Sequence, residues 1–198
     1  MLIITPDYLT QTIAPTTEIV TRTEAKNHLR VDITSDDTLI DNLIIASRQY
    51  CELYTNRAFR VRTSRADVSH FDDTMRLPFS PIISVGSVKY WSTDSPSTLT
   101  TLATTHYELS RNYVSRKYNG VWPSVFPRPD AVQITYTHGY QSTTSPATTE
   151  PVPVAVKAAA LLIIGDLYEN REGQVLYPGQ IQENKTVQML LSAYRVYQ

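Results

Sequence analysis

The stretch from Ser35 to Asn56 constrains the fold most, because its apolar side chains recur every three or four residues. We expect Ser35 to cap a helix there, with Asp36 and Asp37 near the positive end of the helix dipole. Asn56 suits a left-handed C-terminal position. A helix of about 20 residues is roughly 30 Å long and serves as a strut. One stripe of it carries the apolar residues Leu39, Ile40, Leu43, Ile44, Ala46, Tyr50, Leu53 and Tyr54.

Three further segments have helical patterns. Thr21 followed by Glu24 fits a capping box, which predicts a short helix from Glu24 to Arg30. Residues 154–171 are apolar nearly all round, so this helix is expected to be central and the most buried. Residues 183–197 carry an amphipathic stripe. Together these segments predict an antiparallel bundle of three to four helices.

Between residues 60 and 140 the apolar period changes from helical spacing to alternation, and turn residues multiply. The Ser/Thr-rich segments 92–105 and 141–151 are expected to be a surface loop and a linker. The expected strands are Val61–His70, Met75–Leu77, Ile82–Trp91, His106–Leu109, Tyr113–Lys117 and Ala131–Thr137.

The patterns predict an α+β fold in which a small antiparallel β subdomain is inserted into the helical bundle. Residues 1–20 contain two prolines and several threonines and are expected to form an extended N-terminal arm. Residues 21–59 and 151–198 are assigned to the helical bundle domain, and residues 60–150 to the inserted β subdomain.

Composition excludes several classes of protein. The net charge of −1 provides no basic field to hold nucleic acid tightly. Cys51 is the only cysteine, so no intrachain disulfide forms, and within the long helix it is expected to be a small buried apolar group. No signal peptide and no apolar run of ~20 residues is visible, which predicts folding in the cytoplasm without a membrane partner. Thirteen tyrosines against four phenylalanines hint at assembly interfaces.

No constellation of catalytic residues is visible, and we predict no enzyme activity, cofactor or metal. The four histidines are dispersed without the spacing of metal ligands. The Asp36–Asp37 pair is explained by the helix terminus. Asp72 and Asp73 fall in an expected turn, where they are the only candidates for a carboxylate-based hydrolase.

Two groups of side chains are candidates for binding. Arginines cluster directly after the long helix and form either a solvated strand face or contacts to a partner or to DNA in a channel: Arg57, Arg60, Arg62 and Arg65. An alternative function is a β-rich module that recognises carbohydrate or a host surface, with three aromatic rings as stacking platforms: Trp91, Trp122 and Tyr118.

The order of several segments resembles the head-to-tail connector, or adaptor, proteins of tailed bacteriophages and gene transfer agents. The resemblance covers nearly all of residues 21–196 and depends on the order and spacing of the segments together. They are Thr23–Asp32, the Asp36-Asp37-x-x-Ile40 start and Tyr50–Arg57 end of the long helix, Leu77-Pro78-x-x-Pro81-Ile82-x-Ser84-Val85, Val152-Pro153-x-x-Val156-Lys157, Leu167-Tyr168-Glu169-x-Arg171, and Leu190-Leu191-x-x-Tyr194-Arg195.

The resemblance implies a structural protein of the virion neck. Copies are expected to form a dodecameric ring beneath the portal protein, to extend the DNA channel without sequence-specific DNA binding, and to support a tail-completion (stopper) protein. As a hypothesis, the C-terminal helix and tail dock on the portal, although the same apolar stripe could instead pack inside the chain. The residues concerned are Leu190, Leu191, Tyr194, Arg195 and Tyr197.

Overall fold

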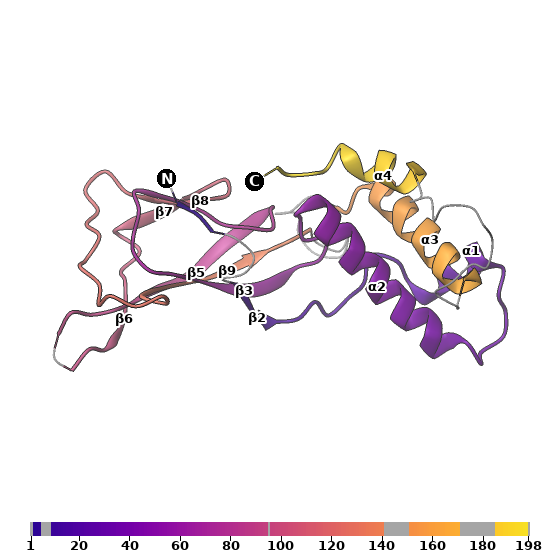
Figure 1. The fold of residues 1–198 in the computed structure, drawn as a ribbon, viewed down its shortest axis with the longest axis horizontal. Coiled ribbons are helices and arrows are strands. Elements are labelled where there is room, and N and C mark those ends of the chain that lie inside the picture. Colours follow the sequence, from indigo (N-terminus) through magenta and orange to yellow (C-terminus); the bar gives the residue numbers. More distant parts are fainter. Residues whose placement is uncertain (1, 5–8, 95, 141–150, 171–184, 198) are drawn as a thin grey trace, which may run out of the picture.

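The computed structural model describes residues 2–4, 9–94, 96–140, 151–170 and 185–197 of the 198-residue chain. The molecule is elongated, with the helices gathered at one end and the strands at the other (Figure 1). Helices and sheets thus occupy separate regions, and the predicted α+β class is confirmed. No helix among these described residues is both long and apolar enough to cross a membrane.

The helical end consists of α1 (Arg22–Leu29), α2 (Asp37–Thr55), α3 (Val154–Glu169) and α4 (Lys185–Ser192). α3 contacts the other three helices and lies between α2 and α4 (Figure 1). All four helices contribute side chains to one hydrophobic cluster, which explains why an almost uniformly apolar helix occupies its centre. Its buried members on the helices are Ala25, Ile40, Ile44, Cys51, Val156, Ala159, Ala160, Ile164, Val187 and Leu191.

The helix termini follow the expected capping chemistry with one exception. The capping box of α1 is confirmed, since the Thr21 hydroxyl accepts from the Glu24 amide at 3.2 Å and Glu24 Oε2 accepts from the Thr21 amide at 2.7 Å. Asn56 adopts the left-handed conformation at φ 54°. The predicted cap at Ser35 is wrong, because its hydroxyl donates to the carboxylate of Asp36, which is itself the N-cap residue.

The strands form two sheets. The five-stranded sheet has the order β2 (Leu9–Ile13), β3 (Arg62–Val68), β9 (Val132–His138), β5 (Ile82–Trp91) and β6 (Leu99–Thr101), and is antiparallel throughout. The four-stranded sheet has the order β1 (Leu2–Ile3), β4 (Thr74–Arg76), β8 (Tyr113–Arg116) and β7 (Tyr107–Ser110), and only its β1–β4 pair is parallel.

A second hydrophobic cluster takes buried residues from both sheets, so the sheets pack on one another. Burial alternates strictly along β9, where Val132, Ile134 and Tyr136 point into this cluster. Met75 of β4 and Val114 of β8 contribute from the other sheet. Alternation with period two is what a sheet with one covered face requires.

The described part of the predicted N-terminal arm, residues 2–4 and 9–20, contains two strands and is incorporated into the molecule. β1 is an edge strand of one sheet and β2 an edge strand of the other. Ile4, Ile19 and Val20 are buried. The partner strands β4 and β3 lie more than 50 residues later in the chain, so no local pattern announces the pairing.

Two segments differ from the expected secondary structure. β6 lies inside the predicted loop 92–105, where it pairs only with β5 at the edge of the sheet, a position that tolerates polar residues. α4 ends at Ser192 and not at Tyr197, because the Val196 amide donates to the carbonyl of Thr55 at the end of α2. The predicted linker 141–150 and the loop after α3, residues 171–184, lie outside the described residues.

Candidate functional site

The arginines after α2 do not form a single exposed row. Arg57 Nε donates to the Tyr194 carbonyl in the C-terminal tail at 2.6 Å. Arg60 is 8% exposed and donates through Nη2 to the Glu18 carbonyl. Burial lowers the pKa of Arg60. These two guanidinium groups therefore fasten distant parts of the chain to the residues that follow α2.

Arg62 belongs to a buried ionic network, which we call the junction and define as Glu18, Arg48, Glu52 and Arg62. Glu52 Oε2 accepts from Arg48 Nη1 at 2.9 Å and from Arg62 Nη1 at 3.0 Å. The other oxygen of Glu52 accepts from the Phe59 amide at 2.9 Å. Arg48 Nε also donates to Glu18 Oε2 at 2.6 Å. The junction thus joins α2 to strand β3 and to the segment before α1.

Arg65 is the more exposed of the two predicted arginines that lie in β3. Its guanidinium donates twice to the Asp67 carboxylate, at 2.9 and 3.0 Å, and its side chain is 37% exposed. The structure therefore places Arg62 in the junction, Arg60 next to it and Arg65 on the sheet surface. Contact of these arginines with a partner or with DNA stays a prediction.

The sequence analysis did not single out Glu18, Arg48 or Glu52. A signal for part of the junction existed, since Arg48 and Glu52 are four residues apart on one helix and border its apolar stripe. No comparable signal marked Glu18, because it meets Arg48 across 30 residues of chain.

The predicted portal-docking residues divide into two groups. Leu191 is fully buried, and Leu190 and Tyr194 pack against the helical cluster, so this part of the stripe faces inward. Arg195 and Tyr197 belong to the exposed tail, where the Arg195 guanidinium lies 5.2 Å from the Tyr54 ring centroid and 5.1 Å from that of Tyr197. Tyr197 is 74% exposed.

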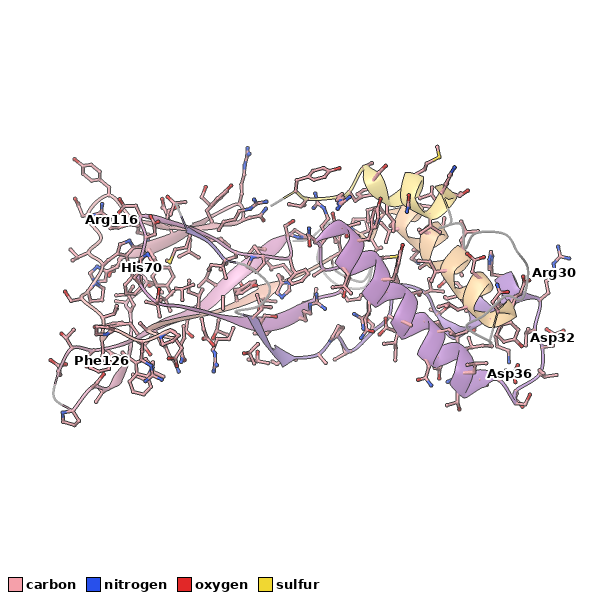
Figure 2. All side chains as sticks on the ribbon, in the orientation of Figure 1. Arg30, Asp32, Asp36, His70, Arg116 and Phe126 are labelled. Carbon is pink, nitrogen blue, oxygen red and sulfur yellow. The ribbon has the colours of Figure 1, made fainter. Side chains whose placement is uncertain are left out.

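The aromatic rings proposed as carbohydrate platforms are mostly covered. The Trp122 ring stacks on Phe71 at 4.6 Å, and the Arg128 guanidinium lies 4.4 Å above the Trp91 ring. Tyr118 alone is fully exposed. Figure 2 places His70, Arg116 and Phe126 at the same end of the molecule, farthest from the helices. The three predicted platforms do not share one open face suited to a sugar.

The titratable groups show no arrangement for catalysis in the described part of the chain. Asp73 pairs with Arg116 at 2.9 Å, and its side chain is 73% exposed. Burial raises the pKa of the Cys51 thiol to about 12, which makes it unreactive at neutral pH. Burial lowers the pKa of His138 to about 3. Within the described residues no group of three or more His, Cys, Asp or Glu side chains is placed to hold a metal ion.

Three solved structures similar to this chain come from gene transfer agent particles. A chain from the virion of a native gene transfer agent (GTA) particle superposes with a TM-score of 0.73 at 19% identity over 96% of both chains. A chain from the neck of an empty GTA particle computed with C6 symmetry gives 0.72 at 18% identity over 96% of both. A chain from the neck of a native GTA particle computed with C12 symmetry gives 0.65 at 20% identity, covering 94% of this chain and 96% of that one.

At these identities the superpositions establish a shared fold across nearly the whole chain. No curated protein matches the sequence. The family model of phage gp6-like head-tail connector proteins matches residues 21–121, which is just over half of the chain and spans α1, α2 and most of the strands. The chain therefore belongs to the gp6-like family of phage head-tail connector proteins.

Proposed function

We propose that copies of this chain form a ring of twelve in the neck of a phage or phage-like particle. The ring lies beneath the portal protein, continues the DNA channel and supports a tail-completion protein. The observation that carries this proposal is the similarity over 94% of the chain to a protein of the GTA neck computed with C12 symmetry, together with membership of the head-tail connector family. The role is structural and requires no catalytic group.

The charge distribution supports a channel that lets DNA pass. The chain has a net charge of −1, so it has no global attraction for phosphate. Several of its arginines are engaged internally, including Arg48, Arg57, Arg60 and Arg62. A channel wall that gripped DNA would oppose its movement, and this chain directs much of its positive charge inward.

The proposal is tested by the particle mass of the purified full-length chain, alone and mixed with the portal protein of the same particle. Mass photometry is expected to give a complex of twelve copies on the portal, and electron microscopy an annulus coaxial with it. A chain that stays monomeric at all concentrations and in the presence of portal protein contradicts the proposal.

We further propose that the exposed part of the C-terminal tail, Arg195 and Tyr197, docks on the portal. Deletion of residues 192–198 is a poor test on its own, because it also removes the bonds from the tail to Thr55, Asn56 and Arg57. Tyr197→Ala removes an exposed ring and its contact with Arg195 but retains the backbone bonds of the tail, and Tyr118→Ala is the matched control at the sheet end.

Tyr197→Ala is expected to weaken portal binding roughly tenfold, the usual effect of removing an aromatic anchor, whereas Tyr118→Ala leaves it unchanged. Biolayer interferometry with immobilised portal measures both. Equal affinities of the two variants and the unchanged chain refute docking through the tail.

We also infer that the two hydrophobic clusters correspond to two domains, a helical bundle and an inserted β domain. The clusters draw on different elements, and only Phe59 and Tyr140, stacked at 5.6 Å, extend the helical cluster toward the strands. The pairing of β1 and β2 with later strands supports assigning the N-terminal arm to the β domain.

A further inference from the structure

An ordinary surface helix carries its charged residues on the side that faces water, whereas those of α2 lie on a side that pairs with other parts of the chain. All four charged residues of α2 make ion pairs within the chain. At 100° per residue they fall within about 60° of the helix circumference. The pairs are Asp37 with Arg22 and Lys26, Asp41 with Arg22, Arg48 with Glu18 and Glu52, and Glu52 with Arg62.

The solvent-facing side of α2 carries no charged residue. We call this side the α2 outer face and define it as Asn42, Ile45, Gln49, Tyr50 and Leu53. Leu53 is 72% exposed, Tyr50 44% and Ile45 39%. Two open grooves border this face, and both also contain charged groups. Gln49 and Leu53 line the first together with Glu52 and Arg62 of the junction, and Ile45 lines the second together with Arg22, Asp41 and the segment before α1.

This composition is characteristic of the centre of a protein interface. A helix face in permanent contact with water normally carries charged side chains. Interface centres are depleted of charge and enriched in aromatic and apolar groups. The α2 outer face matches the second pattern.

A complementary surface lies on the opposite flank of the helical end. α4 buries Val187 and Leu191 and exposes Lys185, Thr186, Met189 and Ser192. Met189 is 76% exposed, and the only charged residue of α4 is Lys185 at its first position. α3 lies between α2 and α4 over most of their length, so these two helices occupy different flanks of the helical end (Figure 1).

We propose that the α2 outer face of one copy packs against the exposed face of α4 on the neighbouring copy. This inference depends on the proposed ring. A closed ring of identical subunits needs two different surfaces on opposite flanks, each complementary to the other. Each face exposes apolar side chains among uncharged polar ones and carries at most one charge, so their contact removes few charges from water. Pairing of two α2 faces would instead close a two-fold dimer.

The first test places a charge in the proposed contact. Leu53→Glu introduces a carboxylate at the α2 outer face, and Val121→Glu makes the same kind of change at the sheet end, where Val121 is 62% exposed. Mass photometry of the full-length chain over a concentration series, with and without portal protein, measures assembly. Leu53→Glu is expected to raise the concentration needed for assembly at least about tenfold, and Val121→Glu to leave it unchanged.

Circular dichroism and thermal unfolding of both variants establish that they fold. If Leu53→Glu forms rings as readily as the unchanged chain, the proposed contact is refuted while the ring stands. If the unchanged chain forms no ring, alone or on the portal, the proposed function fails and this inference fails with it.

The second test identifies the opposing surface. Leu53→Cys and Met189→Cys are made as separate variants and treated with a short bismaleimide; Cys51 is fully buried and serves as an unreactive background. A mixture of the two variants is expected to give cross-linked dimers, and the double variant a ladder of higher multimers. Neither single variant alone should cross-link. Dimers from Leu53→Cys alone would show a two-fold α2 contact and overturn the proposal, as would the absence of cross-links in assembled rings.

Discussion

The junction and the surface of the sheets use ion pairs in different ways. In the junction the pairs are buried, with side-chain exposures of 7% for Arg48 and 5% for Glu52, and they connect separate elements. On the sheets, Arg65 pairs with Asp67 only two residues away, and both side chains are partly exposed. The first arrangement fastens the two ends of the molecule together, whereas the second only covers a surface. α2 directs Arg48 and Glu52 into the junction and Asp37 and Asp41 toward α1, so its outer face is left uncharged.

The sharpest test of this difference is Glu52→Ala. Removal of the carboxylate leaves Arg48 without one of its two acidic partners, Arg62 without its acceptor, and the Phe59 amide without a hydrogen bond. Breaking a buried ion pair in this way costs about 3–5 kcal/mol of unfolding free energy. Urea unfolding followed by circular dichroism measures the loss.

Glu52→Gln is the matched control, since it retains the shape and one acceptor oxygen. It should recover part of the lost stability. A loss below about 1 kcal/mol for Glu52→Ala would place the junction with ordinary surface pairs and remove the contrast.

The next test uses pH. His138 lies beside the junction on β9, where Nδ1 donates to the Phe79 carbonyl at 3.0 Å and Nε2 accepts from the Ser64 hydroxyl at 2.9 Å. Burial and, to a smaller extent, the nearby charge of Arg62 together lower its pKa from 6.5 to about 3. Between these values the unfolded chain binds a proton that the folded chain does not, so stability falls as the pH decreases. The expected loss from pH 7 to pH 5 is about 2 kcal/mol.

Unfolding measured at half-unit pH steps tests this expectation. His138→Gln should flatten the curve over that range, whatever its stability at pH 7. An unchanged slope in the variant would assign the pH dependence to other groups.

A smaller effect is expected at the start of α1. Thr21→Ala removes the hydroxyl that accepts from the Glu24 amide, and loss of such a cap costs about 1 kcal/mol. Thr21→Ser retains the oxygen and should be close to neutral. The midpoint of thermal unfolding of both variants measures how far the helical end depends on local capping rather than on the junction. If Thr21→Ala unfolds at the same midpoint as Thr21→Ser, the cap does not stabilise the helical end.

The smallest effect is expected at the sheet surface. Asp67→Ala breaks both hydrogen bonds from Arg65, yet the guanidinium can turn to water, so the cost should stay below about 1 kcal/mol. Added salt should reduce the difference further. A loss as large as that for Glu52→Ala would show that the two regions do not differ.

Local patterns in the sequence predicted most helices and central strands, because their determinants lie within a few residues. The spacing of apolar groups located α2, and Thr21 with Glu24 located the start of α1. β5 spans Ile82–Trp91 as predicted. Alternation also located β9 to within one residue.

The features that were missed depend on partners far away in the chain. β1 and β2 are strands because β4 and β3 pair with them, whereas the shift of the α2 cap to Asp36 is local, since the Ser35 hydroxyl donates to the neighbouring Asp36. Glu18 is unremarkable until folding brings Arg48 to it. Among the candidate binding residues, the sequence identified the arginine cluster and the C-terminal stripe, but it could not tell which side chains face inward.

The attachment of the C-terminal tail has a mechanical consequence. The Val196 amide donates to the Thr55 carbonyl at 2.9 Å, Asn56 Nδ2 donates to the Val196 carbonyl at 3.0 Å, and Arg57 Nε holds the Tyr194 carbonyl. A pull on the last residues is therefore transmitted to the C-terminal end of α2. Strand β3 of the five-stranded sheet begins a few residues after that end. Tension on the tail is therefore borne first by α2 and the sheet that follows it, before α4 has to unwind.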